Sequence, residues 1–184
     1  MTQADKFDDA VFDGIAATVT PRTEFGASRS TCACSGCKLN CRFMPGFLIP
    51  QDLARMIPLD TDPFLWAEHN LLASPGALVS SEGRKFRIPT LVPATKPDGS
   101  CMNLTDDGRC GIHAIAPFGC AFFSCGPEVP GLSAEGLSAI ILDSIIHGGL
   151  YKRIWTHLHD LGKTQRSAEE LRARMAKHIE EEGL

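Results

Sequence analysis

The sequence predicts a mainly α-helical protein with a small β element, an α+β fold in which loops pack on a helical scaffold. Three observations favour this fold: apolar residues recur at helical spacing after residue 133, two β-like runs flank a turn near residue 82, and the cysteines lie in two groups outside these elements. The chain has 184 residues, 43% of them hydrophobic, which suffices for one ordinary core. We therefore expect an N-terminal extension over residues 1–31, a cysteine-cluster region over 32–130, and a helical region over 131–184 packed on the same domain.

The first part of the chain contains signals for short helices. In the extension, residues 7–12 include apolar side chains that favour one short docked helix. Residues 50–57 begin with a proline and predict another. Asp62 is a suitable N-cap and Pro63 a suitable first residue for a third helix, which we expect to reach Leu72 and to end near residues 74–76.

A small β element is expected in the middle of the chain. Residues 77–80 and 86–92 are rich in β-favouring side chains, and the turn signal Glu82-Gly83 separates them. Pro89 and Pro93 lack a backbone N–H, so the second run should form an edge or irregular strand. Residues 96–99, Lys-Pro-Asp-Gly, predict a tight turn directly before the second cysteine group.

Helices dominate the chain after residue 133. The apolar stripes of two successive predicted helices consist of Leu137, Ile140, Ile141, Ile145 and Ile146, and of Ile154, Trp155, Leu158 and Leu161. We expect the first stripe in the core, with its helix ending at the glycines at 148 and 149, and the second helix ending at Gly162. Ser167 and Glu170 have capping-box spacing and open a charged final helix to about Glu181, which we interpret as mainly solvated.

Net charge and hydropathy argue against several function classes and leave a local basic patch open. The formal net charge is −4, and Lys and Arg are scattered, which argues against a general nucleic-acid or anionic-membrane surface. The N-terminus is polar and acidic where a signal peptide needs a basic start and an apolar run, and no stretch approaches the length of a membrane span. We therefore expect a cytoplasmic protein, in which clustered thiols are metal ligands or redox centres rather than disulfides.

All eight cysteines lie in two groups. The first consists of Cys32, Cys34, Cys37 and Cys41, and the second of Cys101, Cys110, Cys120 and Cys125. In the first group, two or three residues between cysteines let a tight turn direct the sulfurs to one centre, and Gly36 would relax the backbone there. The spacing C-x2-C-x3-C overlaps that of ferredoxins, while C-x2-C alone also fits zinc. The pattern predicts metal binding and leaves the metal open.

The second group contains a turn signal that can bring two of its cysteines together. Asp107-Gly108 predicts a turn that brings Cys101 back towards Cys110. Nearby phenylalanines, Phe43, Phe47, Phe118, Phe122 and Phe123, either exclude water from a metal centre or belong to the ordinary core. His113 lies inside the group, as a ligand or as a hydrogen-bonding neighbour. His157 and His159 are two apart on a predicted helix and are poor joint ligands because they point in different directions.

The cysteine pattern resembles that of the YkgJ-type cysteine-cluster proteins, a family described as chelating zinc or iron. The resemblance covers about residues 32–125 and rests on Cys34-x2-Cys37 and nearby cysteines, then Cys101-x8-Cys110-Gly-Ile-His113, Pro117, Cys120 and Cys125. Ala116 and Ala121 stand where the family has arginines, and Cys41 is separated from Cys37 where relatives often have adjacent cysteines. The resemblance implies that the cysteine framework holds a metal.

Three hypotheses follow. In the first, the cysteines hold a [4Fe–4S] cluster with a redox, sensing or catalytic role; in the second, Zn²⁺ staples a binding module without catalysis. The third, a thiol enzyme with one reactive cysteine, lacks an obvious base in the sequence. Whether the protein is an enzyme stays open, and the expected partner is a metal ion or cluster, with no membrane and no protein partner identified.

Overall fold

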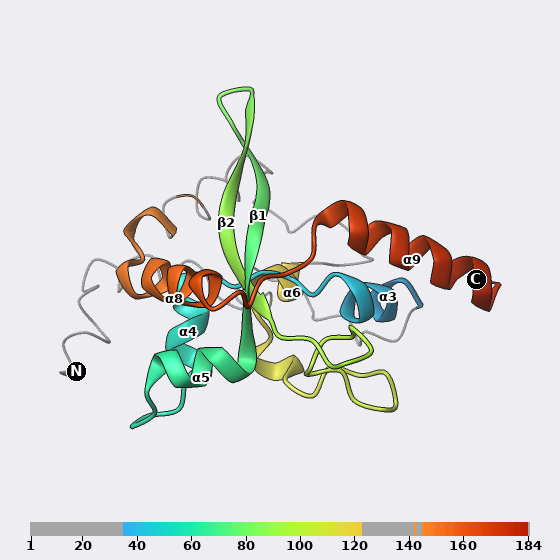
Figure 1. The fold of residues 1–184 in the computed structure, drawn as a ribbon, viewed down its shortest axis with the longest axis horizontal. Helices are drawn as coiled ribbons and strands as arrows, with labels where there is room; N and C mark the ends of the chain where they lie inside the picture. The colour runs from blue at the N-terminus through green and yellow to red at the C-terminus, as the bar shows by residue number, and fades with distance from the viewer. Residues whose placement is uncertain (1–34, 123–141, 143–144, 184) are drawn as a thin grey trace.

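The computed structural model describes residues 35–122, 142 and 145–183 and has the mainly α architecture with one small sheet. The elements, in chain order, are α3 (Ser35–Phe43), α4 (Pro50–Met56), α5 (Pro63–Asn70), β1 (Leu71–Ser81), β2 (Arg84–Pro93), the 3₁₀ helix η2 (His113–Ile115), α6 (Phe118–Phe122), α8 (Gly149–Asp160) and α9 (Ala168–Glu182). Figure 1 shows α4, α5 and α8 on one side of the sheet's base, and α3 and α9 on the other.

The β element is a single antiparallel hairpin that projects from the helices (Figure 1). Its turn lies at the predicted Glu82 and Gly83, which have φ of 50° and 72°. Our expectation that residues 74–76 end a helix is wrong, because β1 continues through them with a register shift between Ser74 and Ala77. The irregularity accommodates a proline that has no N–H to donate, and Gly76 takes a φ of 129° there.

The start of α5 follows the sequence signal, whereas its end does not. The Asp62 carboxylate accepts the N–H groups of Phe64 and Leu65 at 2.8 and 3.0 Å, as the predicted N-cap should. The helix ends at Asn70 instead of Leu72, because Leu71 and the residue after it already pair with β2. Leu71 is fully buried, so tertiary packing overrides helix propensity at this boundary.

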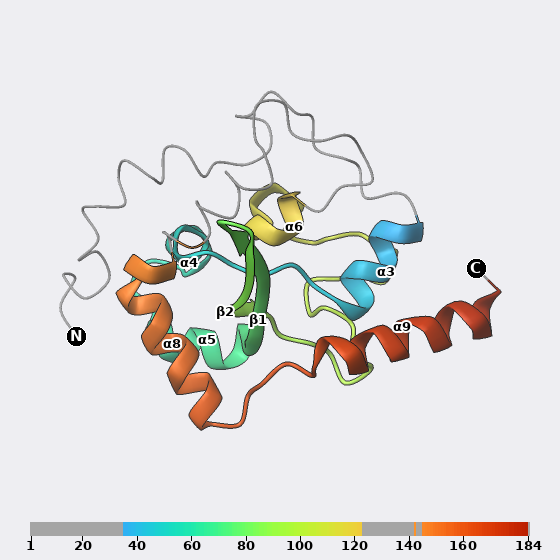
Figure 2. The ribbon, with the colours of Figure 1, turned by 90° about the horizontal axis from the view of Figure 1, so that it is seen from above.

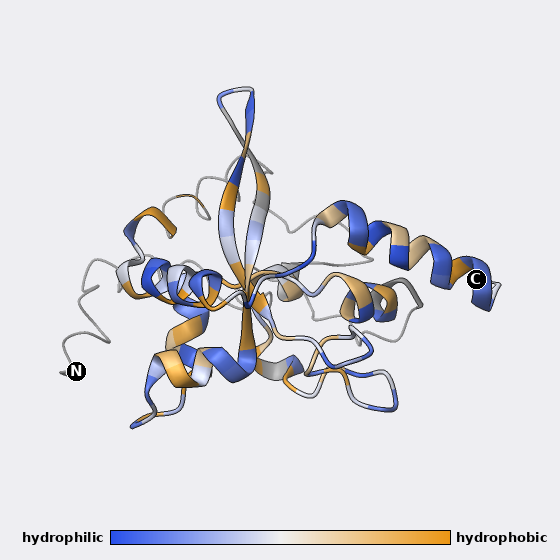
Figure 3. Cartoon of the chain, in the orientation of Figure 1, coloured by the Kyte–Doolittle hydropathy of each residue, from blue (hydrophilic) through white to orange (hydrophobic). Residues whose placement is uncertain are grey.

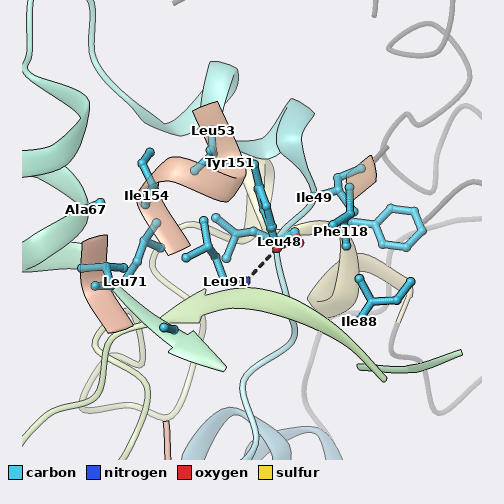
Figure 4. Close-up of a cluster of buried hydrophobic side chains, with 13 residues drawn as sticks. Leu48, Ile49, Leu53, Ala67, Leu71, Ile88, Leu91, Phe118, Tyr151 and Ile154 are labelled. Atoms are coloured by element: carbon cyan, nitrogen blue, oxygen red, sulfur yellow. Dashed lines mark hydrogen bonds between the residues drawn. The ribbon is translucent and has the colours of Figure 1, made fainter. Parts of the chain in front are cut away.

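The hydrophobic core lies where α4, α5 and α8 meet the base of the hairpin (Figure 4). Tyr151 of α8 is buried at its centre, and its hydroxyl donates to the Leu48 carbonyl and accepts the Leu91 N–H, both at 2.7 Å. Burial raises the pKa of this phenol well above its usual value. One polar group thus satisfies two buried backbone groups and fixes α8 against both the hairpin and the segment after α3.

The C-terminal helices differ from expectation in detail. Helix α8 begins at Gly149, where we expect the preceding helix to end, and its Ile154 and Leu158 are fully buried. Ile145 joins the core, but Ile146 is 52% exposed, so this part of the expected core stripe is wrong. The other predicted core positions at 137, 140 and 141 lie outside the described residues.

Helix α9 begins with the predicted capping box and extends away from the core (Figure 2). The Ser167 hydroxyl accepts the Glu170 N–H at 3.2 Å, and the Glu170 carboxylate accepts the Ser167 N–H at 2.9 Å. Figure 3 shows the helix to be largely hydrophilic, in agreement with the interpretation of a mainly solvated helix. Among the described residues, no helix has the length and apolar character needed to span a bilayer.

Candidate metal centre

Four cysteines have described side chains, and they come from three separate segments. Cys41 lies in the last turn of α3, Cys101 and Cys110 lie on the loop after β2, and Cys120 lies in the middle of α6. All four are present as thiols. Cys101 is buried, with 7% of its surface exposed, and the other three are partly buried.

The electrostatics of Cys120 indicate that these thiols converge. Its pKa is raised well above the usual value, first by burial and then by the charges of Cys101, Cys41 and Cys110. The pKa of Cys101 is also raised, mainly by burial and further by the charge of Cys110. Because Coulomb interactions weaken with distance, Cys120 lies within electrostatic reach of the other three thiols. The charges of one cysteine of the first group and two of the second therefore act on Cys120.

Backbone hydrogen bonds bring the loop to α3 and fold it on itself. The Cys101 N–H donates to the Cys41 carbonyl at 3.0 Å, which joins the two sequence groups directly. The turn predicted at Asp107-Gly108 is present, with the Gly108 N–H bonded to the Thr105 carbonyl at 2.9 Å. A β-bridge between Leu104 and Cys110 completes the return of the chain. The expected approach of Cys110 to Cys101 is thereby confirmed.

Two glycines set the position of α6, which carries Cys120. A Cβ at Gly46 would collide with the backbone of Gly119 and Cys120, and a Cβ at Gly119 would collide with the backbone of Phe47. The Gly119 N–H donates to the Phe47 carbonyl at 2.8 Å, and the Cys120 thiol lies 3.8 Å from the Gly46 carbonyl oxygen. Only glycine permits two backbone segments to lie this close.

A buried carboxylate fixes the start of the same helix. Oδ2 of Asp52 accepts the N–H groups of Ile49 and Phe118, each at 2.9 Å, and Oδ1 pairs with Arg55. Asp52 is fully buried, and this burial raises its pKa against the opposing effects of Arg55 and the backbone donors. Sequence reasoning missed Asp52. The available signal, Asp at the third position of a helix that opens with proline, indicates only the local bond to Ile49.

The remaining predicted ligands are less fully described. Cys37 lies in α3, one helical turn before Cys41. The tight turn that we expected around Gly36 is therefore wrong, because residues 35–43 are helical. Cys32, Cys34 and Cys125 lie outside the described residues. His113 opens η2, and its backbone N–H donates to the Cys110 carbonyl at 3.2 Å, which places it beside the site.

The phenylalanines and histidines considered in the sequence analysis contact other side chains rather than one common centre. Phe118 is 3% exposed and belongs to the hydrophobic core, where its ring lies 5.9 Å from that of Phe47. The ring of Phe43 lies 5.3 Å from that of His178 of α9. His157 pairs with Glu68 and His159 stacks on Trp155, so these two histidines serve different contacts, as their spacing predicts.

The residues present fit a thiolate-bound metal by the chemistry of their donors. Within the part of the chain that the structure describes, no group of three or more His, Cys, Asp or Glu side chains forms a ready metal site. The four thiols nevertheless form a soft donor set, and burial of Cys101 and Cys120 disfavours their thiolates unless a cation is present. The raised pKa values also oppose the thiol-enzyme hypothesis for these two residues, since a nucleophilic cysteine needs a lowered pKa.

Comparisons with known proteins find no match to this chain among family models, curated proteins or solved structures. The resemblance to YkgJ-type proteins stays a prediction.

Proposed function

We propose that this protein binds a metal centre through its clustered cysteines, and that the centre is a [4Fe–4S] cluster. The observation that carries the proposal is the hydrogen bond from the Cys101 N–H to the Cys41 carbonyl, which joins the two cysteine groups, and the charges of Cys41, Cys101 and Cys110 also raise the pKa of Cys120. These four cysteines would hold the centre, and Cys37, one turn from Cys41, is a further candidate. An all-thiolate donor set is the one that iron–sulfur clusters use.

The residues around the thiols would determine the properties of the centre. A bound cluster would supply one-electron chemistry, or an open iron coordination site if only three cysteines bound it. Burial of Cys101 and the close packing of α6, which carries Cys120, on the Gly46 segment would limit the access of water to these two sulfurs. The chain's own contribution is then to gather the ligands, to hold them in a dry environment and to release their protons when metal binds.

The second candidate is a Zn²⁺ staple, and one observation favours it. The four thiols lie on α3, the loop after β2 and α6, so a metal ion bound by them would link these three segments in addition to the backbone bond from Cys101 to Cys41. Four thiolates are a common structural zinc set, and such a site contributes directly to folding. In this case the protein would be a binding module without a reaction of its own.

Purification under anaerobic conditions, with iron, sulfide and zinc analysis, tests the proposal. A brown protein with broad visible absorbance and stoichiometric iron and sulfide supports the cluster. A colourless protein with one equivalent of zinc supports the staple. A folded protein that takes up neither metal, even after reconstitution, would overturn the proposal.

Single Cys→Ser variants identify the ligands. We expect severe loss of metal from variants at Cys37, Cys110 and Cys120, and loss also at Cys41 and Cys101. The matched control is Glu82→Gln, a change at the exposed tip of the hairpin. Full metal content in all the cysteine variants would show that these residues are not the ligands.

A further inference from the structure

A cleft of about 480 Å³ lies between α3, the loop after β2 and α9. Its walls come from α3, from the loop after β2 and from α9, and α9 packs along α3 (Figures 1 and 2). The lining residues that matter here are Lys38, Leu39 and Arg42 of α3, Lys96, Asp98 and Leu104 of the loop, and His178 and Glu182 of α9. A volume of this size is typical of pockets for small molecules.

Two cations of α3 have unused capacity to bind an anion. Arg42 has one hydrogen-bond contact, 3.3 Å from its Nη1 to Nε2 of His178, where the ring nitrogen accepts. Within the described part of the chain, neither Arg42 nor Lys38 forms an ion pair with a carboxylate. The two side chains are four residues apart on one helix and therefore share a face. Arg42 still has most of its planar set of donors available.

The acidic residues that line the cleft, Asp98, Asp106 and Glu182, oppose the positive charges of Lys38 and Arg42 to different extents. The Asp98 carboxylate accepts the Ser100 N–H at 2.9 Å and the Ser100 hydroxyl at 2.7 Å. These bonds lower the pKa of Asp98 most, and the charges of Arg42 and Lys96 lower it further, so Asp98 offsets part of the charge of these two side chains. Lys96 also donates to the Leu104 carbonyl at 2.5 Å. Asp106 and Glu182 are exposed carboxylates and would oppose an anion.

We propose that this cleft binds a small organic anion through a carboxylate or phosphate group. Arg42 offers paired N–H donors, Lys38 adds a second charge one turn away, and the side chains of Leu39 and Leu104 provide apolar contact for a carbon skeleton. Arg42 follows the candidate ligand Cys41 directly in α3, but none of the described cysteines lines the cleft, so the anion site is distinct from the proposed metal centre. The proposal goes beyond metal binding and does not require that the metal be present.

Isothermal titration of the full-length protein with citrate and with inorganic phosphate, at one low ionic strength, tests the site. We expect saturable binding, and we expect Lys38→Gln and Arg42→Gln each to weaken it by roughly tenfold, the worth of one charge-assisted contact. Glu182→Gln should tighten binding because it removes an opposing charge. The control is Lys177→Gln on the same helix, since Lys177 lies outside the cleft and pairs with Glu181.

The outcomes separate this proposal from the metal proposal. Tighter binding of citrate identifies carboxylates as the ligand class, and tighter binding of phosphate identifies phosphates. The proposal is overturned if neither probe saturates, or if both α3 variants bind like the wild type. Metal content is measured on the same samples, so metal-loaded protein without anion binding overturns the cleft alone, and metal-free protein that binds anions overturns only the metal centre.

Discussion

Asp52 and Phe118 are 66 residues apart in sequence, yet Oδ2 of the Asp52 carboxylate accepts the backbone N–H of Phe118 at 2.9 Å. Phe118 is the first residue of α6, and Cys120 follows two residues later. The same oxygen accepts the N–H of Ile49 at the start of α4. A single buried carboxylate therefore links the entry to α4 with the helix that carries one of the candidate ligands.

Replacement of Asp52 should destabilise the protein and weaken metal binding. Asp52→Ala leaves two buried N–H groups without an acceptor, and we expect a loss of about 3 kcal/mol in the free energy of unfolding. Asp52→Asn keeps an acceptor oxygen and should lose less. Urea unfolding measures the effect, with Asp160→Asn on the exposed end of α8 as the control. Equal stability of Asp52→Ala and wild type would contradict this role.

Alanine at Gly46 or Gly119 should displace α6 from its neighbour. Each added methyl group meets backbone atoms that have no room to move, so we expect a cost of about 1–3 kcal/mol and reduced metal retention. Gly149→Ala is the matched control, because no atom lies within 4 Å of the Cβ position there and alanine favours the helix. Thermal unfolding of the three variants, together with their metal content, tests this prediction. Similar behaviour of all three would argue against the close approach.

Metal uptake should release protons from the cysteine site. Because the pKa values of Cys101 and Cys120 are raised, these groups are protonated at neutral pH in the metal-free protein. Binding of a metal ion to Cys101 and Cys120 as thiolates then releases at least the protons of these two groups, and the affinity rises with pH. Titration in weakly buffered solution measures the protons, and competition with a chelator measures the affinity. Cys120→Ser should release one proton fewer, and uptake without proton release would refute thiolate ligation.

Acid should loosen the start of α9. Hydrogen bonds from Ser167 hold the pKa of Glu170 below its usual value of 4.5, so its ionised form is favoured in the folded helix. The resulting stabilisation is complete above about pH 4.5 and is lost as the pH falls through the lowered pKa. Amide hydrogen exchange or NMR titration of α9 detects this loss. In Glu170→Gln the pH dependence at the helix start should disappear, and a persistent transition would assign it to another group.

The sequence predicts those features that depend on neighbouring residues. The Asp62 cap, the Ser167–Glu170 capping box and the Asp107-Gly108 turn each need only a few residues in a fixed order, and all three are present. The sequence predicts that α5 continues to Leu72, but the helix ends at Asn70 because pairing of Leu71 with β2 competes with helix formation. Helix propensity alone does not include the gain from burying that leucine in the core.

The candidate site depends on contacts between distant segments, which spacing does not encode. The hydrogen bond from Cys101 to Cys41, which joins the two cysteine groups, and the place of Cys120 in α6 follow only from the fold. Gly46 follows a proline in the sequence and is consistent with an ordinary loop. The need for glycine at position 46 becomes evident only in the fold, where the backbone of Gly119 lies directly against it.

The core around Tyr151 has a consequence for the order of assembly. Its buried cluster unites α4, α5, α8 and the hairpin base, and no cysteine is among its members in the described chain. Protein produced without metal should therefore keep this core intact. The proposed metal centre would then be filled only after the core has formed.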